Sequence, residues 1–317
     1  MTPPARTLAV VHETAYRYDA PTELAHHLAY LRPLDDAWQA LEAHALHIEP
    51  EPPHVQTAPD AFGNWRSTFA LYAPHDALLV RASSRVAVRA RHADLQPEAG
   101  VPWEEAALRL RYRAGAAYAP EAEFAFPSPY VPLHAELRDY ARPSFAPGRP
   151  LPLAALDLMH RIHADFTYDP ASTHVATPVL EAYTQRYGVC QDYAHVMLGC
   201  LRALGLAARY VSGYLVSQPP PGQPRLVGAD ASHAWVSVHC PGLPGNGGWL
   251  DLDPTNDLVP GLGHVILAYG RDYGDVTPMR GVIRGGGGHA LAVRVTVAPW
   301  DELPAGLEVP APATAGG

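Results

Sequence analysis

The sequence contains no lysine, so arginine supplies all 23 of its basic residues. The 32 acidic residues outnumber them, and the formal net charge at pH 7 is −9. A surface with an excess of negative charge repels polyanions. We therefore expect neither nucleic acid nor an anionic membrane surface to be a partner of this protein.

Cysteine is also scarce, since the 317 residues include only Cys190, Cys200 and Cys240 and no CxxC pair. This sparse, odd set is typical neither of a disulfide framework nor of a cysteine-based zinc site. Reduced cysteines indicate the cytoplasm, and we expect Cys200 and Cys240 to be core residues. No stretch approaches about 20 consecutive apolar residues, and the N-terminus lacks the apolar region of a signal peptide. The sequence thus predicts a cytoplasmic protein without a membrane-spanning segment.

The composition predicts a folded protein, because 48% of the residues are hydrophobic and 17% are charged. Residues 8–90 hold short alternating runs between proline, aspartate and glycine, which favours an antiparallel β-sandwich-like domain. Expected strands there are 8–18, 24–34, 43–49, 65–72 and 78–90; expected helices further on are 102–113, 133–141, 153–166 and 177–187. We predict four regions: a β-rich domain at 1–95, a connecting helical and loop segment at 96–150, a core domain at 151–300 and a flexible tail at 301–317.

The stretch YGVCQDYAHVMLGCLRALGLAARYVSGY at 187–214 is the centre of the expected core domain. Its apolar residues surround a helix instead of lining one face, which predicts a buried helix that ends at Gly205. A strand at 207–216 follows and is ended by the proline-rich run at 219–222. Cys190 lies at the N-terminal end of this helix. There the helix dipole and unpaired N–H groups favour a thiolate and provide donors for an oxyanion.

Two later segments supply a base and an acid. His233 lies near the start of an alternating strand in DASHAWVSV, and Asp253 ends a second short strand in WLDLDPTN. Nucleophilic catalysis by a thiol needs a base for the sulfur and a third group that orients the imidazole. Asp251 lies two residues before Asp253 on the same strand face, so it stays open as an alternative acid.

The motifs YGVCQDYAH, ARYVSGYL, DASHAWV and WLDLDPTND resemble, in order and spacing, the core of the transglutaminase-like superfamily. The match looks closest to bacterial members, regarded as cysteine peptidases, that carry an extra β-rich N-terminal domain. Residues 60–88 and 268–297 also resemble segments of these proteins. The resemblance implies an α+β fold: a papain/transglutaminase-like core, in which a helix bearing the cysteine packs on an antiparallel sheet, plus an N-terminal β-sandwich-like domain.

The resemblance also implies a catalytic triad: Cys190 is the nucleophile, His233 the general base and acid, and Asp253 the residue that orients His233. The thiolate would attack a peptide or carboxamide carbonyl and form a thioester. Water would then make the protein a cysteine peptidase or amidase, and an amine would make it a protein-glutamine acyltransferase. The sequence leaves both open and favours hydrolysis. The expected partner is a peptide, protein or small amide substrate.

Other residues near the motifs have less specific roles. We expect His195 to pack near the site without acting as the base, and Asp192 either to stabilise the first helical turn or to shape substrate access. The histidines of the N-terminal region lack metal-ligand spacing and no calcium-binding loop is evident, so we predict no metal and no other cofactor. The ligand spacing also disfavours a zinc hydrolase. A non-catalytic binding scaffold with the same fold is the alternative function.

Overall fold

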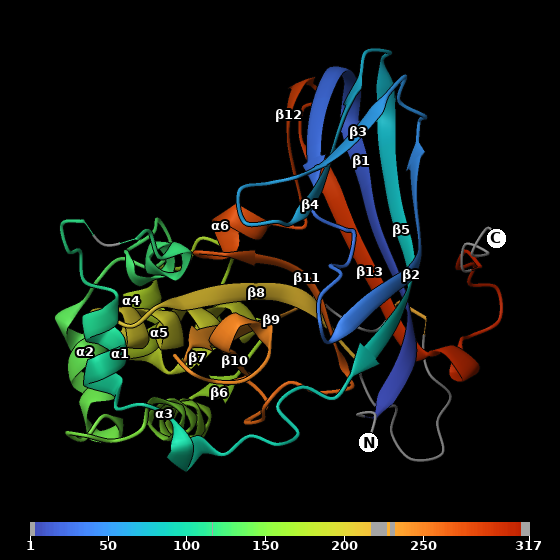
Figure 1. Cartoon of the computed structure of the whole chain (residues 1–317). Helices are drawn as coiled ribbons and strands as arrows, with labels where there is room; N and C mark the ends of the chain where they lie inside the picture. Colours follow the sequence, from blue (N-terminus) through green and yellow to red (C-terminus); the bar gives the residue numbers. More distant parts are fainter. Residues whose placement is uncertain (1–3, 116, 217–226, 229–231, 312–317) are drawn as a thin grey trace.

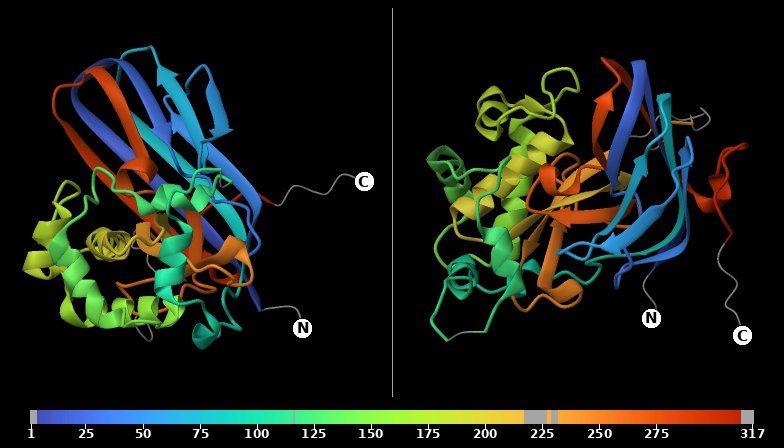
Figure 2. Two further views of the ribbon diagram at one scale, coloured as in Figure 1. Left: turned by 60° about the vertical axis from the view of Figure 1, so that its left-hand side comes forward. Right: turned by 90° about the horizontal axis from the view of Figure 1, so that it is seen from above.

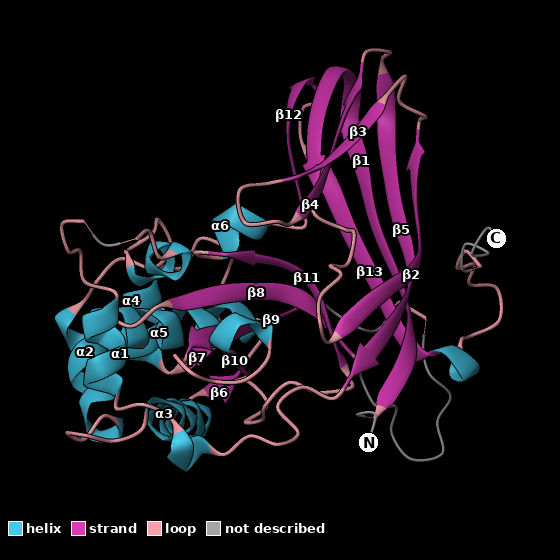
Figure 3. Ribbon diagram, viewed as in Figure 1, coloured by secondary structure: helices cyan, strands magenta, loops and turns pink. Residues whose placement is uncertain are grey.

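The computed structural model describes residues 4–115, 117–216, 227–228 and 232–311. Figure 1 shows a tall part made of strands beside a mixed part in which helices surround a smaller sheet. Figure 3, coloured by secondary structure, shows the longer helices gathered on one side of the molecule. The proline-rich run predicted to end a strand at 219–222 lies outside the described residues, as do residues 312–317 of the predicted tail.

Seven strands form the sheet of the tall part, in the order β2-β5-β1-β4-β3 with β12 and β13 also paired to β1. These strands are β1 (Ala5–Ala29), β2 (Gln39–Glu49), β3 (Val55–Pro59), β4 (Trp65–Leu71), β5 (His75–Arg89), β12 (Met279–Gly285) and β13 (His289–Pro299). All pairs are antiparallel. The expected strand at 8–18 and the first part of the one expected at 24–34 therefore belong to the single long strand β1, which ends at Ala29, so the prediction of a strand over 30–34 is wrong.

The sheet folds over on itself at residues 17–24 of β1, where the pairing register shifts and the strand changes partners. The first half of β1 pairs with β5 and β13, and its second half pairs with β4 and β12. Gly285, Gly286 and Gly287 lie at the bend with φ values of 85°, 83° and 62°, a region that glycine adopts without steric cost. Buried residues from both halves, such as Phe69 and Leu78, share one core. This arrangement is the predicted β-sandwich-like domain.

The two C-terminal strands correct the predicted domain boundaries. The sequence pattern placed residues 151–300 in one core domain, but β12 and β13 run along β1 from Ala29 back to Leu8. An antiparallel ladder is held by backbone hydrogen bonds whichever part of the chain supplies the strand. An alternating pattern identifies a strand without identifying its neighbour. The sandwich is thus completed by residues 279–299.

The mixed part is built on a four-stranded antiparallel sheet in the order β10-β9-β8-β11. Its strands are β8 (Ala208–Leu215), β9 (Ser232–His239), β10 (Trp249–Leu252) and β11 (His264–Gly270). The helices are α1 (Trp103–Arg109), α2 (Ala135–Ala141), α3 (Leu151–Asp165), α4 (Val179–Gln185), α5 (Cys190–Ala203) and α6 (Tyr273–Val276). A two-stranded parallel pair, β6 (Thr167–Tyr168) and β7 (Tyr187–Gly188), precedes α5, and 3₁₀ segments lie at Pro97–Ala99, Pro120–Ala125, Arg142–Ser144, Asn246–Gly248 and Trp300–Glu302.

Helix α5 is enclosed on every side, as its apolar pattern predicts. Every residue from Gln191 to Arg202 is buried, with α2, α3 and α4 on some sides and β8 and β9 on another. The left view of Figure 2 looks nearly along this helix and shows other helices around it. Gly199 allows α2 to approach, since a Cβ there would lie 2.5 Å from a methyl of Leu137. Burial of this size fixes the position of the helix N-terminus.

The opposite face of the four-stranded sheet packs against the N-terminal region. Val211, Trp235 and Ile266 form a buried cluster there with Leu34, and Trp65 packs against it. The sheet is therefore covered by α5 on one face and by segments that connect the sandwich strands on the other. None of the helices in the described ranges has the length and apolar character needed to cross a membrane.

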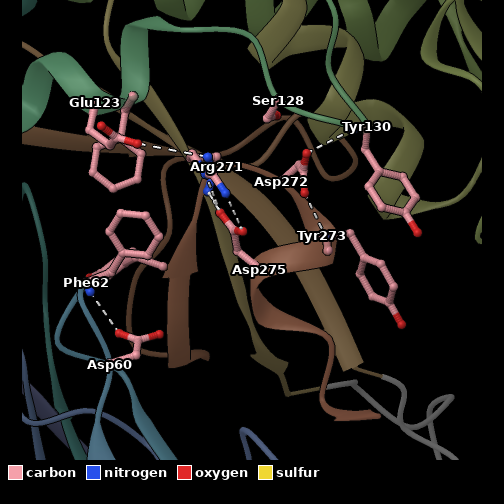
Figure 4. Close-up of polar contacts among 12 residues, drawn as sticks. Asp60, Phe62, Glu123, Ser128, Tyr130, Arg271, Asp272, Tyr273 and Asp275 are labelled. Carbon is pink, nitrogen blue, oxygen red and sulfur yellow. Dashed lines mark hydrogen bonds and ion pairs between the residues drawn. The ribbon is translucent and has the colours of Figure 1, made fainter. Parts of the chain in front are cut away.

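Polar contacts fasten the far end of β11 to the helical part (Figure 4). The carboxylate of Asp272 accepts hydrogen bonds from the backbone N–H groups of Tyr130 and Gly274, both at 2.9 Å. Beside it, Arg271 pairs with Asp275 at 2.9 Å and with Glu123 at 3.9 Å. These contacts fix the direction of β11, whose first residue lies at the site described next.

Candidate active site

Cys190 is the first residue of α5, and its side chain is half-buried. The carbonyl of Val189 accepts from the N–H groups of Asp192 and Tyr193 at 2.9 and 3.2 Å. The first four N–H groups of a helix have no partner within it. In the described part of the chain, no protein acceptor is bonded to the N–H groups of Cys190 and Gln191. Two donors beside the sulfur are therefore free to bind an external oxygen.

Asp192 fixes this helix start. Its Oδ2 accepts from the N–H of Val189 at 2.8 Å and from the hydroxyl of Thr173 at 2.7 Å. Burial raises the pKa of Asp192, although the two hydrogen bonds oppose that shift. Gly188 makes the approach possible, because a Cβ there would lie 2.5 Å from the carboxylate. These contacts favour the helix-stabilising role of Asp192 over a role in substrate access.

His233, the second residue of β9, lies near both other members of the predicted triad. Its Nε2 lies 2.7 Å from Oδ2 of Asp253, and Cys190 is near enough to act on the charge of the ring. Because Nε2 of His233 forms the hydrogen bond with Asp253, Nδ1 is the ring nitrogen that remains available to the sulfur of Cys190. Burial opposes a charged ring, but the hydrogen bond to Asp253 and the nearby Cys190 raise the pKa of His233 to about 10.

Asp253 is completely buried and yet surrounded by donors. Its Oδ1 accepts from the N–H groups of Thr255 and Asn256 at 3.1 and 3.2 Å, which closes a turn directly after β10. Its Oδ2 accepts from His233 and from the side-chain amide of Asn256 at 2.8 Å. Burial alone would raise the pKa of Asp253, but these hydrogen bonds, with one from His264, hold it well below the usual range. The residue is therefore an ionised carboxylate.

Asp251, the alternative acid, has a different partner. Its Oδ2 lies 3.1 Å from a guanidinium nitrogen of Arg91, and both side chains are 0% exposed. Arg91 follows β5 and belongs to the connection between the sandwich and the helices. Although Asp251 and Asp253 lie on the same strand face, the structure brings only Asp253 to His233.

The remaining residues noted in the sequence have core contacts. Cys200 and Cys240 are buried, and burial raises the pKa of both thiols. His195 is buried against the ring of Tyr210, and its Nε2 accepts from the N–H of Tyr273 at 3.2 Å. Burial also lowers the pKa of His195. These surroundings fit the packing roles predicted for all three.

His264 is the site residue that the sequence analysis missed. It is 3% exposed, it begins β11, and its Nε2 lies 3.2 Å from Oδ2 of Asp253. The predicted elements did not include β11, so the position of its histidine relative to Asp253 was not predictable. The available signal was the short apolar run HVILAYG, which is typical of a buried strand with a polar residue at its start.

His233, Asp253 and His264 also form the one group among the described residues whose ligand atoms lie close enough to hold a metal ion, within 4.8 Å of one another. Two nitrogens and a carboxylate oxygen are a donor set that zinc accepts. The separations from Asp253 Oδ2, at 2.7 and 3.2 Å, are hydrogen-bond distances. We assign the group to hydrogen bonding.

The surface beside the thiol carries exposed aromatic side chains. The β6–β7 pair places Tyr168 opposite Gly188, two residues before Cys190. Tyr168 is 53% exposed, and Tyr187, at the start of β7, is 47% exposed. These rings are available to a molecule that approaches the sulfur.

Two cavities lie away from the thiol. One of about 770 Å³ is bounded by residues 90–101 and 240–245, and one of about 580 Å³ lies on the sandwich near His26 and His54. Cys190 lines neither of them. A substrate of Cys190 would therefore meet the molecule outside both cavities.

Comparisons with known proteins agree with this fold. Residues 8–87 match a family model described as the bacterial transglutaminase-like N-terminal region, and residues 139–254 match the model of the transglutaminase-like superfamily. An uncharacterised protein of Mycobacterium tuberculosis (strain H37Rv) is 40% identical over 295 residues, which cover 92% of each chain. An uncharacterised protein of Mycobacterium leprae is 30% identical over 294 residues, covering 92% of this chain and 98% of the relative.

Two further proteins have names that describe an activity. A protein-glutamine gamma-glutamyltransferase of Pseudomonas aeruginosa is 32% identical over 136 residues, which are 41% of this chain and 20% of that protein. The solved structure of a candidate cysteine protease from Cytophaga hutchinsonii superposes with a TM-score of 0.71 at 19% identity, covering 95% of this chain and 93% of that one. At that identity the structural likeness supports the fold alone.

Proposed function

Since the chain belongs to the transglutaminase-like superfamily, we propose that it is a thiol-dependent enzyme that breaks amide bonds and forms a thioester. Cys190 is the nucleophile, His233 is the general acid and base, and Asp253 orients His233. The observation that carries this proposal is the hydrogen bond between His233 and Asp253 at 2.7 Å, with Cys190 near enough to act on the charge of the His233 ring. A buried structural cysteine needs no such partner.

The first step is attack on the carbonyl. The thiolate of Cys190 forms a bond to the carbonyl carbon, and the electron pair of the C=O bond moves to oxygen. The free N–H groups of Cys190 and Gln191 donate hydrogen bonds to this oxyanion. The helix dipole of α5 favours the same negative charge.

The second step expels the amine. When the C–N bond breaks, its electron pair stays with nitrogen, and the proton held by His233 passes to that nitrogen. Asp253 accepts a hydrogen bond from the Nε2–H of the remaining neutral imidazole and so fixes its tautomer. The products of this half-reaction are a free amine and a thioester on Cys190.

The third step resolves the thioester. Neutral His233 takes a proton from water or from an amine, which attacks the thioester carbonyl and releases the thiolate. Water gives a peptidase or amidase, which we favour, and an amine gives an acyltransferase. Because the chain has no lysine, a lysine acceptor would have to come from another molecule. The exposed Tyr168 and Tyr187 suit a peptide or an apolar amide.

The test is incubation with a library of amide probes and a fluorescent primary amine. Amine incorporation that disappears in Cys190→Ala indicates acyl transfer, and cleavage without incorporation indicates hydrolysis. Cys200→Ala is the matched control, because it removes a thiol from the same helix without touching His233. Activity that survives in Cys190→Ala contradicts the proposal.

The alternative, a non-catalytic binding scaffold, is distinguished by the thiol itself. A thiolate paired with His233 reacts quickly with iodoacetamide at neutral pH and slows in His233→Ala. A slow reaction that does not depend on His233 would favour the scaffold.

A further inference from the structure

We propose that His264, on the edge strand β11, is a positioning residue of this site that orients Asp253 toward His233. The inference rests on the proposed function and deepens it. It starts from the observation that one oxygen, Oδ2 of Asp253, lies within hydrogen-bond distance of both imidazoles, at 2.7 Å for His233 and 3.2 Å for His264.

The direction of the second hydrogen bond is fixed by the chemistry of its partners. An ionised carboxylate only accepts, so Nε2 of His264 must carry a proton and donate it. Burial lowers the pKa of His264 in spite of the neighbouring carboxylate, so this ring is neutral. Asp253 therefore receives a hydrogen bond from one neutral imidazole and one protonated imidazole.

A glycine on the strand between the two histidines leaves room for the side chain that packs on His264. His233 is on β9 and His264 is on β11, and β8 lies between them. Gly213 of β8 pairs with His233 on one side and with Ile266 on the other. A Cβ on Gly213 would lie 2.5 Å from the ring of Trp235. Without a side chain on the middle strand, residues of the outer strands can meet above it.

Trp235 uses this space and holds the ring of His264. The two rings meet edge to face with centroids 5.2 Å apart, and the Trp235 side chain is 0% exposed. The centroids of His233 and His264 are 6.1 Å apart. Because packing restricts the ring of His264, its N–H direction is set before any substrate arrives.

His264 contributes what the other donors to Asp253 lack. The bonds from Thr255 and Asn256 come from the turn that contains Asp253, so they move with it. His264 belongs to a separate strand, so its bond ties Asp253 to the body of the sheet. The titratable and charged groups that face this pair are His233 on β9, Cys190 through His233, and Arg91 near His264.

The experiment compares His264→Phe with His264→Gln by the pH dependence of Cys190 alkylation and of amide turnover. The hydrogen bond from His264 lowers the pKa of Asp253. Reactivity that depends on ionised Asp253 is present at neutral pH and is lost as the pH falls through that pKa. Removing the donor raises the pKa of Asp253. The acidic limb of the pH profile, in which reactivity is lost as the pH falls, should therefore move up by about one pH unit in His264→Phe. Its turnover at neutral pH falls about tenfold.

His264→Gln keeps an N–H donor that does not titrate, so its acidic limb stays near that of the wild type. His264→Asn has an amide too short to reach Asp253 and should behave like His264→Phe, which keeps the test usable if the latter does not fold. His12→Phe is the matched control. His12 is also buried, but it forms hydrogen bonds with Tyr214 and Thr14. Its replacement should therefore lower stability without shifting the acidic limb of the pH profile.

The outcomes separate the two proposals. Equal acidic limbs in the wild type, His264→Asn and His264→Gln would overturn the role of His264, whatever the enzyme does. Amide turnover that survives in Cys190→Ala would overturn the proposed function. In that case the alkylation profiles would still report whether His264 supports the Asp253–His233 pair.

Discussion

Two carboxylates near the C-terminal end of β10 have equal burial and different surroundings. Asp251 and Asp253 are both 0% exposed, yet Asp251 is paired with Arg91 and Asp253 with two imidazoles. An arginine stays charged across the whole working pH range, so the Asp251 region is a permanent ion pair between two segments of chain. An imidazole exchanges its proton near neutral pH. Burial alone therefore does not identify a reactive carboxylate, whereas the partner does.

Asp253→Asn should have the largest effect on chemistry. An asparagine amide donates where the carboxylate accepts, so His233 would be held in the wrong tautomer. We expect turnover to fall about 10³- to 10⁴-fold with the fold preserved. Steady-state kinetics with an amide probe measure the loss of turnover, and circular dichroism checks that the fold is preserved. A loss below tenfold in a folded variant would argue that Asp253 is not the orienting acid.

Asp251→Asn should instead act on stability. It leaves the guanidinium of Arg91 buried without a counter-charge, which costs about 3–5 kcal/mol in the free energy of unfolding. Denaturant unfolding measures this loss. The double variant Asp251→Leu with Arg91→Met removes both charges and should recover most of it. If Asp251→Asn lowered turnover as much as Asp253→Asn while remaining as stable as the wild type, the contrast between the two regions would be lost.

The pH dependence of stability sharpens the same contrast. The pKa of His233 is raised from its ordinary value of 6.5 to about 10 in the folded protein. Its contribution to stability is therefore complete below about pH 6.5 and is lost as the pH rises through about 10. Unfolding free energies of the wild type and His233→Gln should thus differ most at the acidic end of that range and converge toward the alkaline end. A difference that stayed constant over this range would show that His233 is not charged in the folded protein.

Gly213→Ala should have the smallest of these effects. The added methyl would lie 2.1 Å from the carbonyl of Val265 and 2.5 Å from Trp235, so strand or ring must shift. We expect a loss of about 1–3 kcal/mol in stability. The acidic limb should also move toward that of His264→Phe, because His264 packs on Trp235. Gly63→Ala is the comparison, since its Cβ would meet nothing within 4 Å, although its positive φ adds some strain.

The sequence predicted those parts of the site that lie in continuous segments. Cys190 begins a helix whose apolar residues leave no exposed face, and His233 begins an alternating strand, so both local settings could be inferred. The structure also brings Asp253 to His233, as the sequence proposed. These three positions depend on local patterns and on a resemblance carried by short motifs.

The contribution of His264 depends on strand order, which local patterns do not contain. Only the order β9-β8-β11 and the missing side chain of Gly213 bring it to Asp253. The same reason explains the misplaced C-terminal strands, because the alternation of residues 289–299 is compatible with either sheet. The long strand β1 was predicted as two strands with a break at 19–23, because the Asp19 and Pro21 region is typical of a turn in the sequence.

The pairing of β1 with β13 has a consequence for synthesis of the protein. Leu8 lies beside Pro299, so β1 is synthesised well before the strand that it pairs with. In the meantime the helices and the β10-β9-β8-β11 sheet have already been made and can collapse around α5. Until residues 279–299 emerge, one side of β1 is an open edge that invites pairing with other chains. Nascent chains that stall before Met279 would carry a completed thiol site beside an unprotected strand.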